Sequence, residues 1–335
     1  MNIKEVARRA NVSISTVSRV INNTAKVSPD ARARVEKVLK ETKYRPNSLA
    51  RELQQKRTNT IGILMSAYDF DSSSIGKSIN AITDILKSEG YNIMLGNSRF
   101  HEDEEFEFLR VFQEKRVDGI LYFASSFSDK HKEILEDYPI PIVMVGQKYD
   151  EIDIPYVIYD DYNGAKTATE YIIKQGHQKI GYIGCPLYDT AAGVMRKKGY
   201  EDAFREAGIN NDIGYEIEGD FTLESGYKAA KELFSRNISK PSALVVATDF
   251  MAMGTIRYLT EQGLNVPNDI SVIGFDDINV SAYYNPPLTT IRTDKEDAGI
   301  QASNLLLSIL RKESVTKTHV TVGYELIKRN SVKSI

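Results

Sequence analysis

Apolar side chains recur every three or four positions through the first 45 residues, and this spacing predicts helices. Three segments carry such an apolar stripe, formed by Ile3, Val6, Ala7 and Ala10, by Val17, Val20 and Ile21, and by Val35, Val38 and Leu39. Ser13 is suited to cap the second helix, and Ser28 followed by Pro29 is suited to begin the third. Because three residues interrupt the pattern between the first two helices, residues 1–45 are predicted to form a small all-α domain with a helix-turn-helix.

Residues 46–59 are predicted to be a linker, although Leu49, Ala50 and Leu53 keep helical spacing within it. A helix this short is only marginally stable by itself. We therefore expect it to form only where a partner supports it.

From residue 60 the pattern changes to apolar runs that alternate with amphipathic segments. Buried strands are predicted over Thr60–Met65, Tyr91–Ser98, Asp118–Ala124, Ile142–Gln147, Lys179–Gly184, Ala243–Ala247 and Ser271–Phe275. Helices are predicted between strands, for example over Lys77–Glu89 and Ala165–Gln175. This alternation is typical of α/β proteins with doubly wound parallel sheets. Because the segment 60–335 is long for a domain built on a single sheet of this kind, we expect two lobes with a cleft between them.

Charge is distributed unevenly between the two parts. The whole chain has a net charge of −3, yet residues 1–58 hold 14 basic and 5 acidic side chains, a net charge of +9. The rest of the chain holds 29 basic and 41 acidic side chains, a net charge of −12. A basic head on an acidic body indicates a local anionic partner, and the DNA phosphate backbone is the usual one.

Several functional classes are disfavoured by composition. The single cysteine, Cys185, excludes a disulfide framework and a Cys-based zinc site within one chain, and it fits a reducing cytoplasm. The N-terminus has no apolar signal region and no apolar run is long enough to span a membrane, so we expect a cytoplasmic protein. With 4 His, no nucleophile elbow, no phosphate loop and no metal-ligand cluster, we expect neither an enzyme nor a cofactor.

The segment from Ile14 to Asn22 has the pattern of a recognition helix. Val17, Val20 and Ile21 face inward, which leaves the intervening residues exposed. Small hydrogen-bonding side chains near the start of such a helix let its backbone approach the major groove, and an arginine such as Arg19 donates two hydrogen bonds to guanine.

These motifs resemble the lactose/galactose repressor family of bacterial transcription regulators. In the headpiece the resemblance lies in Thr16-Val17-Ser18-Arg19-Val20-Ile21-Asn22, Tyr44-Arg45-Pro46-Asn47 and Leu49-Ala50-Arg51 followed by Leu53. It continues through Arg116-Val117-Asp118-Gly119, Gly176-His177, Asp249-Phe250-Met251-Ala252, Ile273-Gly274-Phe275-Asp276-Asp277 and Pro287-Leu288-Thr289-Thr290-Ile291. The resemblance therefore covers essentially the whole chain.

The resemblance implies which residues bind DNA. Ile14, Ser15 and Arg19 would read base edges, while Thr16, Ser18 and Asn22 would contact phosphates. Residues 47–54 would form a hinge helix that contacts DNA through Asn47, Ala50, Leu53 and Gln54. Leu53 would be the apolar wedge that unstacks a base step in the minor groove and bends the DNA; the alternative is a leucine that packs between domains.

The resemblance also implies a periplasmic-binding-protein-like unit with an effector in the cleft. Its N-lobe would comprise residues 60–160 plus 291–321, and its C-lobe residues 161–290 plus 322–335. The implied effector-binding residues are Ser73, Ser74, Ile75, Arg196, Phe221, Thr248 and Asp276. Arg196 and Asp276 would bind sugar hydroxyls and Phe221 would stack on the ligand, whereas the alternatives are a surface arginine and a core phenylalanine. Asp277 is expected to cap a turn, and His177 to be a cation at a helix end.

The predicted function is a transcription regulator, expected to repress carbohydrate-utilisation genes. It would bind a pseudo-palindromic double-stranded operator as a homodimer or a tetramer, and its effector would be a sugar or a sugar phosphate. Two alternatives stay open within the family: a global carbon-catabolite regulator that answers to a phosphorylated carrier protein, and a purine-responsive repressor. The basic head disfavours a pure solute-binding protein.

Overall fold

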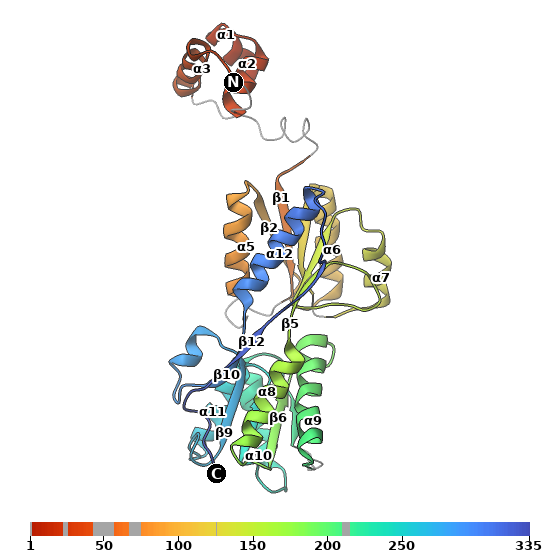
Figure 1. Cartoon of the computed structure of the whole chain (residues 1–335), viewed down its shortest axis with the longest axis vertical. Coiled ribbons are helices and arrows are strands. Elements are labelled where there is room, and N and C mark those ends of the chain that lie inside the picture. Colours follow the sequence, from red (N-terminus) through yellow and green to blue (C-terminus); the bar gives the residue numbers. More distant parts are fainter. Residues whose placement is uncertain (1, 23–25, 43–56, 67–74, 125, 210–214) are drawn as a thin grey trace. The chain divides into compact units, whose positions relative to one another are not determined.

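The computed structural model describes residues 2–22, 26–42, 57–66, 75–124, 126–209 and 215–335. The chain divides into two compact units, Met1–Thr58 and Asn59–Ile335 (Figure 1). Among the described residues, no helix has the length and apolar character needed to cross a membrane.

The first unit is a three-helix domain. Its helices are α1 (Ile3–Ala10), α2 (Ile14–Asn22) and α3 (Pro29–Thr42). Their apolar stripes meet in one core formed by Val6, Ala7, Ala10, Val17, Val20, Val35 and Val38. Asn11 takes the left-handed conformation that ends α1, and the Ser13 hydroxyl accepts the Thr16 N–H at 3.1 Å. The predicted helices and the Ser13 cap are confirmed.

The second unit contains two six-stranded sheets. The first sheet has the strand order β11-β5-β4-β3-β1-β2, and its described strand pairs are parallel. Its strands are β1 (Thr60–Met65), β2 (Asn92–Asn97), β3 (Gly119–Phe123), β4 (Ile142–Val145), β5 (Tyr156–Tyr159) and β11 (His319–Val322). Helices α5 (Gly76–Ser88) and α12 (Lys295–Leu310) pack on one face, and α6 (Glu102–Lys115) and α7 (Asp129–Glu136) on the other. This sheet and these helices form the N-lobe.

The second sheet has the strand order β12-β10-β9-β8-β6-β7, in which only β10 and β12 pair antiparallel among the described strands. Its strands are β6 (Ile180–Gly184), β7 (Glu216–Glu218), β8 (Ala243–Val246), β9 (Ser271–Asp276), β10 (Thr289–Thr293) and β12 (Tyr324–Ile327). Its helices are α8 (Asp161–Lys174), α9 (Arg196–Ala207), α10 (Leu223–Ser235) and α11 (Asp249–Glu261), with a π-helix η1 (Thr190–Met195) and a 3-10 turn η2 (Asn279–Ala282). This sheet and these helices form the C-lobe.

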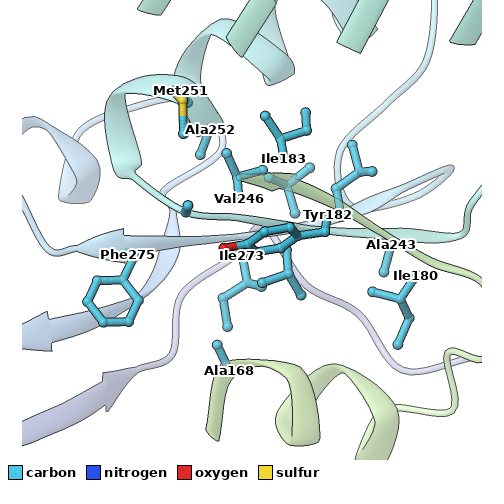
Figure 2. Close-up of a cluster of buried hydrophobic side chains, with 14 of the residues drawn as sticks. Ala168, Ile180, Tyr182, Ile183, Ala243, Val246, Met251, Ala252, Ile273 and Phe275 are labelled. Carbon is cyan, nitrogen blue, oxygen red and sulfur yellow. The ribbon is translucent and has the colours of Figure 1, made fainter. Parts of the chain in front are cut away.

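Central strands of both sheets are buried along their whole length, which explains their continuous apolar runs in the sequence. Figure 2 shows this core in the C-lobe, where Ile183, Val246 and Ile273 from neighbouring strands lie between the helices. The described helices supply the matching apolar faces, with Ala168 from α8 and Met251 from α11.

The chain passes between the lobes at three points. β5 leads through Asp160 into α8, β10 leads through Asp294 into α12, and β11 leads through Gly323 into β12 (Figure 1). The sequence placed the second of these crossings at residue 291, but β10 stays in the C-lobe sheet through Thr293 because it pairs there with β9 and β12. Residues at these crossings are well placed to respond to any change in the relation of the lobes.

Candidate functional site

Helix α2 exposes the side chains that the sequence assigned to DNA. Ile14 is 44% exposed, and Ser15 and Arg19 are also exposed, while Val17 and Val20 are buried against α1 and α3. An exposed isoleucine at the start of a helix suits contact with another apolar surface, such as a thymine methyl group.

The other predicted DNA-binding residues are placed only in part. Thr16 and Ser18 are half-buried, and the Ser13 hydroxyl lies 2.9 Å from that of Thr16. Asn22 is the last residue of α2. Asn47, Ala50, Leu53 and Gln54 lie outside the described residues, as do Ser73 and Ser74 of the predicted cleft loop.

Acidic side chains of the first unit are paired with its cations. Arg8 and Arg9 donate hydrogen bonds to Glu5 and lower the pKa of this carboxyl to about 2. Arg34 pairs with Asp30 one turn away on α3. Such exposed pairs contribute little to stability in water, and they leave the positive excess of residues 1–58 unchanged.

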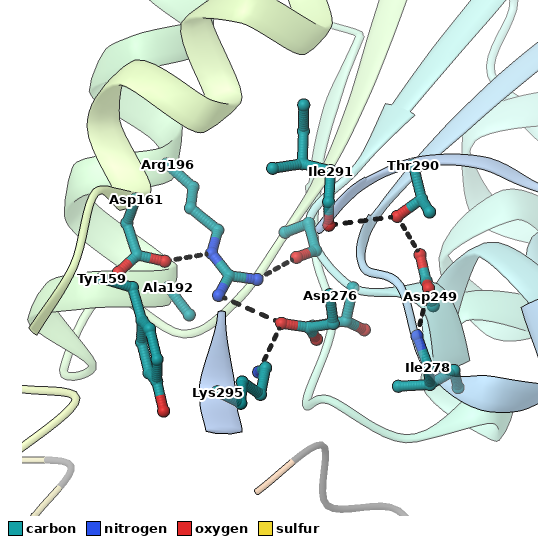
Figure 3. A network of polar contacts seen from close by, with 12 residues as sticks. Tyr159, Asp161, Ala192, Arg196, Asp249, Asp276, Ile278, Thr290, Ile291 and Lys295 are labelled. Atoms are coloured by element: carbon teal, nitrogen blue, oxygen red, sulfur yellow. Dashed lines mark hydrogen bonds and ion pairs between the residues drawn. The ribbon is translucent and has the colours of Figure 1, made fainter. Parts of the chain in front are cut away.

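Arg196, the first residue of α9, is the centre of a buried network (Figure 3). Its Nε donates to Asp161 Oδ1 at 2.7 Å, and its Nη1 donates to the Ala247 carbonyl oxygen at 2.5 Å. Its Nη2 lies 3.5 Å from Asp276 Oδ1, and its guanidinium carbon lies 3.7 Å from the centre of the Phe275 ring. Only 5% of Arg196 is exposed, so this arginine is not a surface donor.

Lys295 adds a second cation to this network. Its Nζ lies 2.9 Å from Asp276 Oδ1, and its own carbonyl oxygen accepts the Ser78 hydroxyl. Lys295, Asp276 and Asp161 are all buried. Asp161 and Lys295 are the first residues of α8 and α12, directly after two of the crossings, and Asp276 is the last residue of β9. Two cations thus balance two carboxylates where the lobes join.

Burial and charge shift the pKa values within the network. Burial raises the pKa of Asp161 above its ordinary value, although Arg196 opposes this shift. Burial disfavours the charged form of Arg196, but the carboxylates of Asp161 and Asp276 outweigh it and raise the pKa of the guanidinium. The arginine therefore keeps its charge.

Asp249, the first residue of α11, forms a second polar cluster beside the first. It accepts the Thr290 hydroxyl at 2.6 Å and the Ile278 N–H at 3.0 Å (Figure 3). It also accepts the Ser281 hydroxyl at 2.5 Å. Burial, with the nearby charge of Asp276, raises the pKa of Asp249 from 3.8 to about 7. Gly274 leaves room for this carboxyl, because a Cβ there would lie 2.2 Å from Asp249 Oδ1.

Replacing Asp249 with asparagine is expected to change how stability depends on pH. The folded chain holds the Asp249 proton up to about pH 7 and the unfolded chain only to about pH 4, so this stabilisation is complete below pH 4 and is lost as the pH rises to 7. Relative to that of the native chain, the free energy of unfolding of Asp249→Asn, measured in urea, should therefore rise by about 1–3 kcal/mol between pH 5 and pH 8. Asp137→Asn, at an exposed carboxyl, should show no such trend; parallel pH profiles for Asp249→Asn and the native chain would contradict the shift.

Two further residues of the C-lobe differ in their surroundings from what the sequence suggested. Asp277 does not cap a turn: it is buried and binds Arg292 and Arg329 through its two oxygens. His177 is not a helix-end cation, because burial lowers its pKa while its ring bonds Ser242 and the Lys333 carbonyl.

Thr248 and Ile75 occupy helix starts. The Thr248 side chain caps α11 by accepting the Met251 N–H at 3.2 Å, and Ile75 precedes α5 and packs against the N-lobe core. The oxygen of Thr248 is therefore already used as an acceptor within the protein. Cys185 is buried, and this burial raises the pKa of its thiol. Among the described residues, no group of His, Cys, Asp or Glu side chains is arranged to hold a metal ion.

Phe221 contacts an aromatic side chain of the opposite lobe. Its ring is nearly parallel to that of Phe100, with an interplanar angle of 10° and centroids 6.0 Å apart. Phe100 follows β2 of the N-lobe, and its ring also lies 6.3 Å from Tyr188 of the C-lobe. Both phenylalanines have positive φ, of 63° and 72°, a conformation that non-glycine residues rarely adopt. Sequence reasoning found Phe221 but missed Phe100, Lys295, Asp161 and Gln147.

Comparison with known proteins matches both units. Residues 2–47 match the family model "Bacterial regulatory proteins, lacI family", and residues 169–332 match "Periplasmic binding protein-like domain". The chain is 34% identical to Catabolite control protein A of Priestia megaterium over 99% of both chains. It is 35% identical to the HTH-type transcriptional repressor PurR of Klebsiella pneumoniae (strain 342), over 98% of this chain and 96% of that one.

A solved structure agrees with the whole fold. The Lac repressor dimer bound to operator and the anti-inducer ONPF superposes with a TM-score of 0.90 at 28% identity, covering 100% of this chain and 99% of that one. The predicted fold class, a helix-turn-helix domain joined to a two-lobed periplasmic-binding-protein-like unit, is confirmed.

Proposed function

Because the chain belongs to the lacI family of bacterial regulatory proteins, we propose that a small molecule between the lobes controls how tightly its helix-turn-helix binds an operator. The chain is a DNA-binding transcription regulator and not an enzyme. The observation that carries the proposal is the face of α2, where Ile14, Ser15 and Arg19 are exposed on a unit with a net charge of +9. Ile14, Ser15 and Arg19 read base edges, and Thr16, Ser18 and Asn22 contact phosphates.

The effector that the cleft residues suit best is a sugar. Arg196 offers a planar fork of donors and Asp276 offers carboxylate oxygens, a combination that suits neighbouring hydroxyl groups. Since Lys295 and Arg196 balance Asp161 and Asp276, an uncharged hydroxylated molecule leaves the site neutral. Ser73, Ser74, Ile75, Phe221 and Thr248 complete the proposed site.

The regulatory mechanism follows from the three crossings. A homodimer places one headpiece on each half of a pseudo-palindromic operator in the bacterial cytoplasm. In this mechanism residues 47–54, which lie outside the described residues, would act as hinge helices that support each other across the dimer, and Leu53 would enter the minor groove. An effector that prefers one arrangement of the lobes shifts the population of hinge states by no more than its difference in affinity for the two.

The relative from Priestia megaterium favours a second candidate. Its name, Catabolite control protein A, supports a carbon-catabolite regulator as the second candidate. A thermal-shift screen against sugars, sugar phosphates and purines tests for a small-molecule effector, because only a ligand that prefers the folded chain raises its melting temperature.

The proposal is tested by selecting duplexes from a random pool with the full-length chain. We expect a pseudo-palindrome, and we expect Arg19→Ala to lose about 1–3 kcal/mol of discrimination at one base pair per half-site while non-specific binding changes little. Lys37→Ala removes the same charge from the exposed surface of α3 and should leave base preference intact. A pool without enrichment refutes the proposal, and equal losses on all sequences refute the role of Arg19.

A further inference from the structure

One side chain of the N-lobe binds two groups of the C-lobe at once. Gln147 follows β4, after Gly146 turns the chain with a φ of 82°. Its Nε2 donates to Asp189 Oδ1 at 2.8 Å, and its Oε1 accepts the Ala191 N–H at 3.2 Å. Gln147 and Asp189 are 5% and 8% exposed, so water competes little for these hydrogen bonds.

The element that Gln147 binds is the first turn of the π-helix η1. Asp189 caps this helix, because its Oδ1 also accepts the Ala192 N–H at 2.7 Å. Gly193 lets the helix lie against the preceding loop, since a Cβ there would lie 2.0 Å from the Pro186 carbonyl oxygen. Short π-helical turns are rare and are frequent at functional sites.

The π-helix leads directly to Arg196. The Arg196 N–H donates to the Ala191 carbonyl oxygen, so Ala191 is held by Gln147 at its N–H and holds Arg196 at its C=O. The hydrogen bonds therefore run without a break from the N-lobe, through Ala191 of the C-lobe, to the backbone of the residue that binds Asp161 and Asp276.

We propose that Gln147 is a positioning residue that couples closure of the lobes to the placement of Arg196. When the lobes are together, the Gln147 amide fixes both the cap and the first turn of η1, and the start of α9 is fixed with them. When the lobes separate, both hydrogen bonds break and the turn that carries Arg196 loosens. This inference rests on the proposed function only in taking Arg196 to be part of the effector site.

The chemistry at Asp189 explains why the partner is an amide. Burial raises the pKa of Asp189 from 3.8 to about 6, and the charged or titratable groups that act on it are Arg196, Asp161, Tyr149 and Cys185. A glutamine supplies one donor for the carboxylate and one acceptor for the Ala191 N–H. A glutamate side chain at this position still accepts the Ala191 N–H, but it places a second carboxylate beside that of Asp189, and the two repel each other.

The test is hydrogen–deuterium exchange of the full-length chain, followed by mass spectrometry. In Gln147→Glu at pH 8, amides of residues 190–195 and of the first turn of α9 should exchange about tenfold faster than in the native chain. At pH 5 the two carboxyls share a proton and the ratio should fall towards one. Adding Asp189→Asn should restore slow exchange at pH 8, because the amide introduced by this second substitution then donates to the carboxylate introduced by the first.

Matched variants separate coupling from general damage. Gln113→Glu adds the same charge to the exposed surface of α6 and should leave these amides unchanged. Gln147→Met removes both hydrogen bonds without adding a charge, so it should also accelerate exchange at pH 8, and it serves if Gln147→Glu does not fold.

Three results overturn the inference: unchanged exchange in both Gln147 variants, faster exchange in η1 that stops before Arg196, or no rescue by Asp189→Asn. Neither DNA nor effector is present in this experiment. A failure here therefore leaves the proposed function standing, and a failed duplex selection leaves this coupling standing.

Discussion

Arg196→Met is expected to lower the free energy of unfolding by about 3–5 kcal/mol, because it leaves the buried carboxylates of Asp161 and Asp276 without their shared cation. For a unit of this size the melting temperature should fall by about 10 °C. The same variant should lose its response to any effector that forms hydrogen bonds with Arg196. Urea unfolding measures the first effect, and ligand-induced thermal shifts of the variant, recorded against its own baseline, measure the second.

Two control variants show whether the loss of stability and of effector response in Arg196→Met comes from the buried guanidinium. Arg257→Met removes an exposed arginine that pairs with Glu261 one turn away on α11, and it should cost less than about 1 kcal/mol. Arg196→Lys keeps the charge but loses the fork, so it should retain more stability than the methionine variant while losing effector response. An Arg196→Met chain as stable as the native one would contradict the buried network.

The sequence was most informative about elements with a long, regular apolar pattern. Helices α1 to α3 and six of the seven predicted strands were found because each buries a stripe or a run that periodicity detects. The seventh strand, β2, was predicted to be buried, but it lies at the edge of its sheet, and most of its side chains are half-buried or exposed. Helix α8 begins at Asp161 rather than at the predicted Ala165, since Asp160 caps it four residues earlier. Strands β5 and β7 were not predicted, and β7, with three residues, is too short to give a pattern of its own.

The residues of the candidate site also fall into two groups, those that were predicted from the sequence and those that were not. Arg196 and Asp276 were picked out by the resemblance to the repressor family, and the structure brings them to 3.5 Å, although their role in effector binding stays a proposal. Lys295 and Asp161 each follow an aspartate cap at a helix start, where a charged residue usually has only a local role.

The partners of these two residues lie far along the chain, so no local pattern distinguishes Lys295 or Asp161 from any other residue in a first helical turn. Gln147 and Phe100 follow strands of the N-lobe, and their contacts with Asp189 and Phe221 form only when the C-lobe is in place. Contacts of this kind depend on topology and cannot be derived from the periodicity of one segment.

Operator binding is expected to weaken about 10³–10⁵-fold when monovalent salt rises from 50 to 200 mM, the range for proteins with six to ten phosphate contacts. Each headpiece carries a net charge of +9, and a dimer brings two of them to one duplex. Residues 59–335 carry −12 and are repelled by phosphate, so the counterions released on binding are displaced by the headpieces. Fluorescence anisotropy with the selected duplex, at six or more salt concentrations, gives the slope of log K against log salt.

Single substitutions assign that slope to residues. Among the exposed head cations Lys4, Lys26, Lys37 and Lys40, replacement of one that faces phosphate by glutamine should lower the slope by about two per dimer. Lys228→Gln, on the exposed surface of α10, should leave it unchanged. If no head variant changes the slope, or if Lys228→Gln changes it equally, the charge of the first unit does not bind the duplex. The positive charge of residues 1–58 would then serve a different anionic partner, since residues 59–335, with a net charge of −12, cannot attract DNA electrostatically.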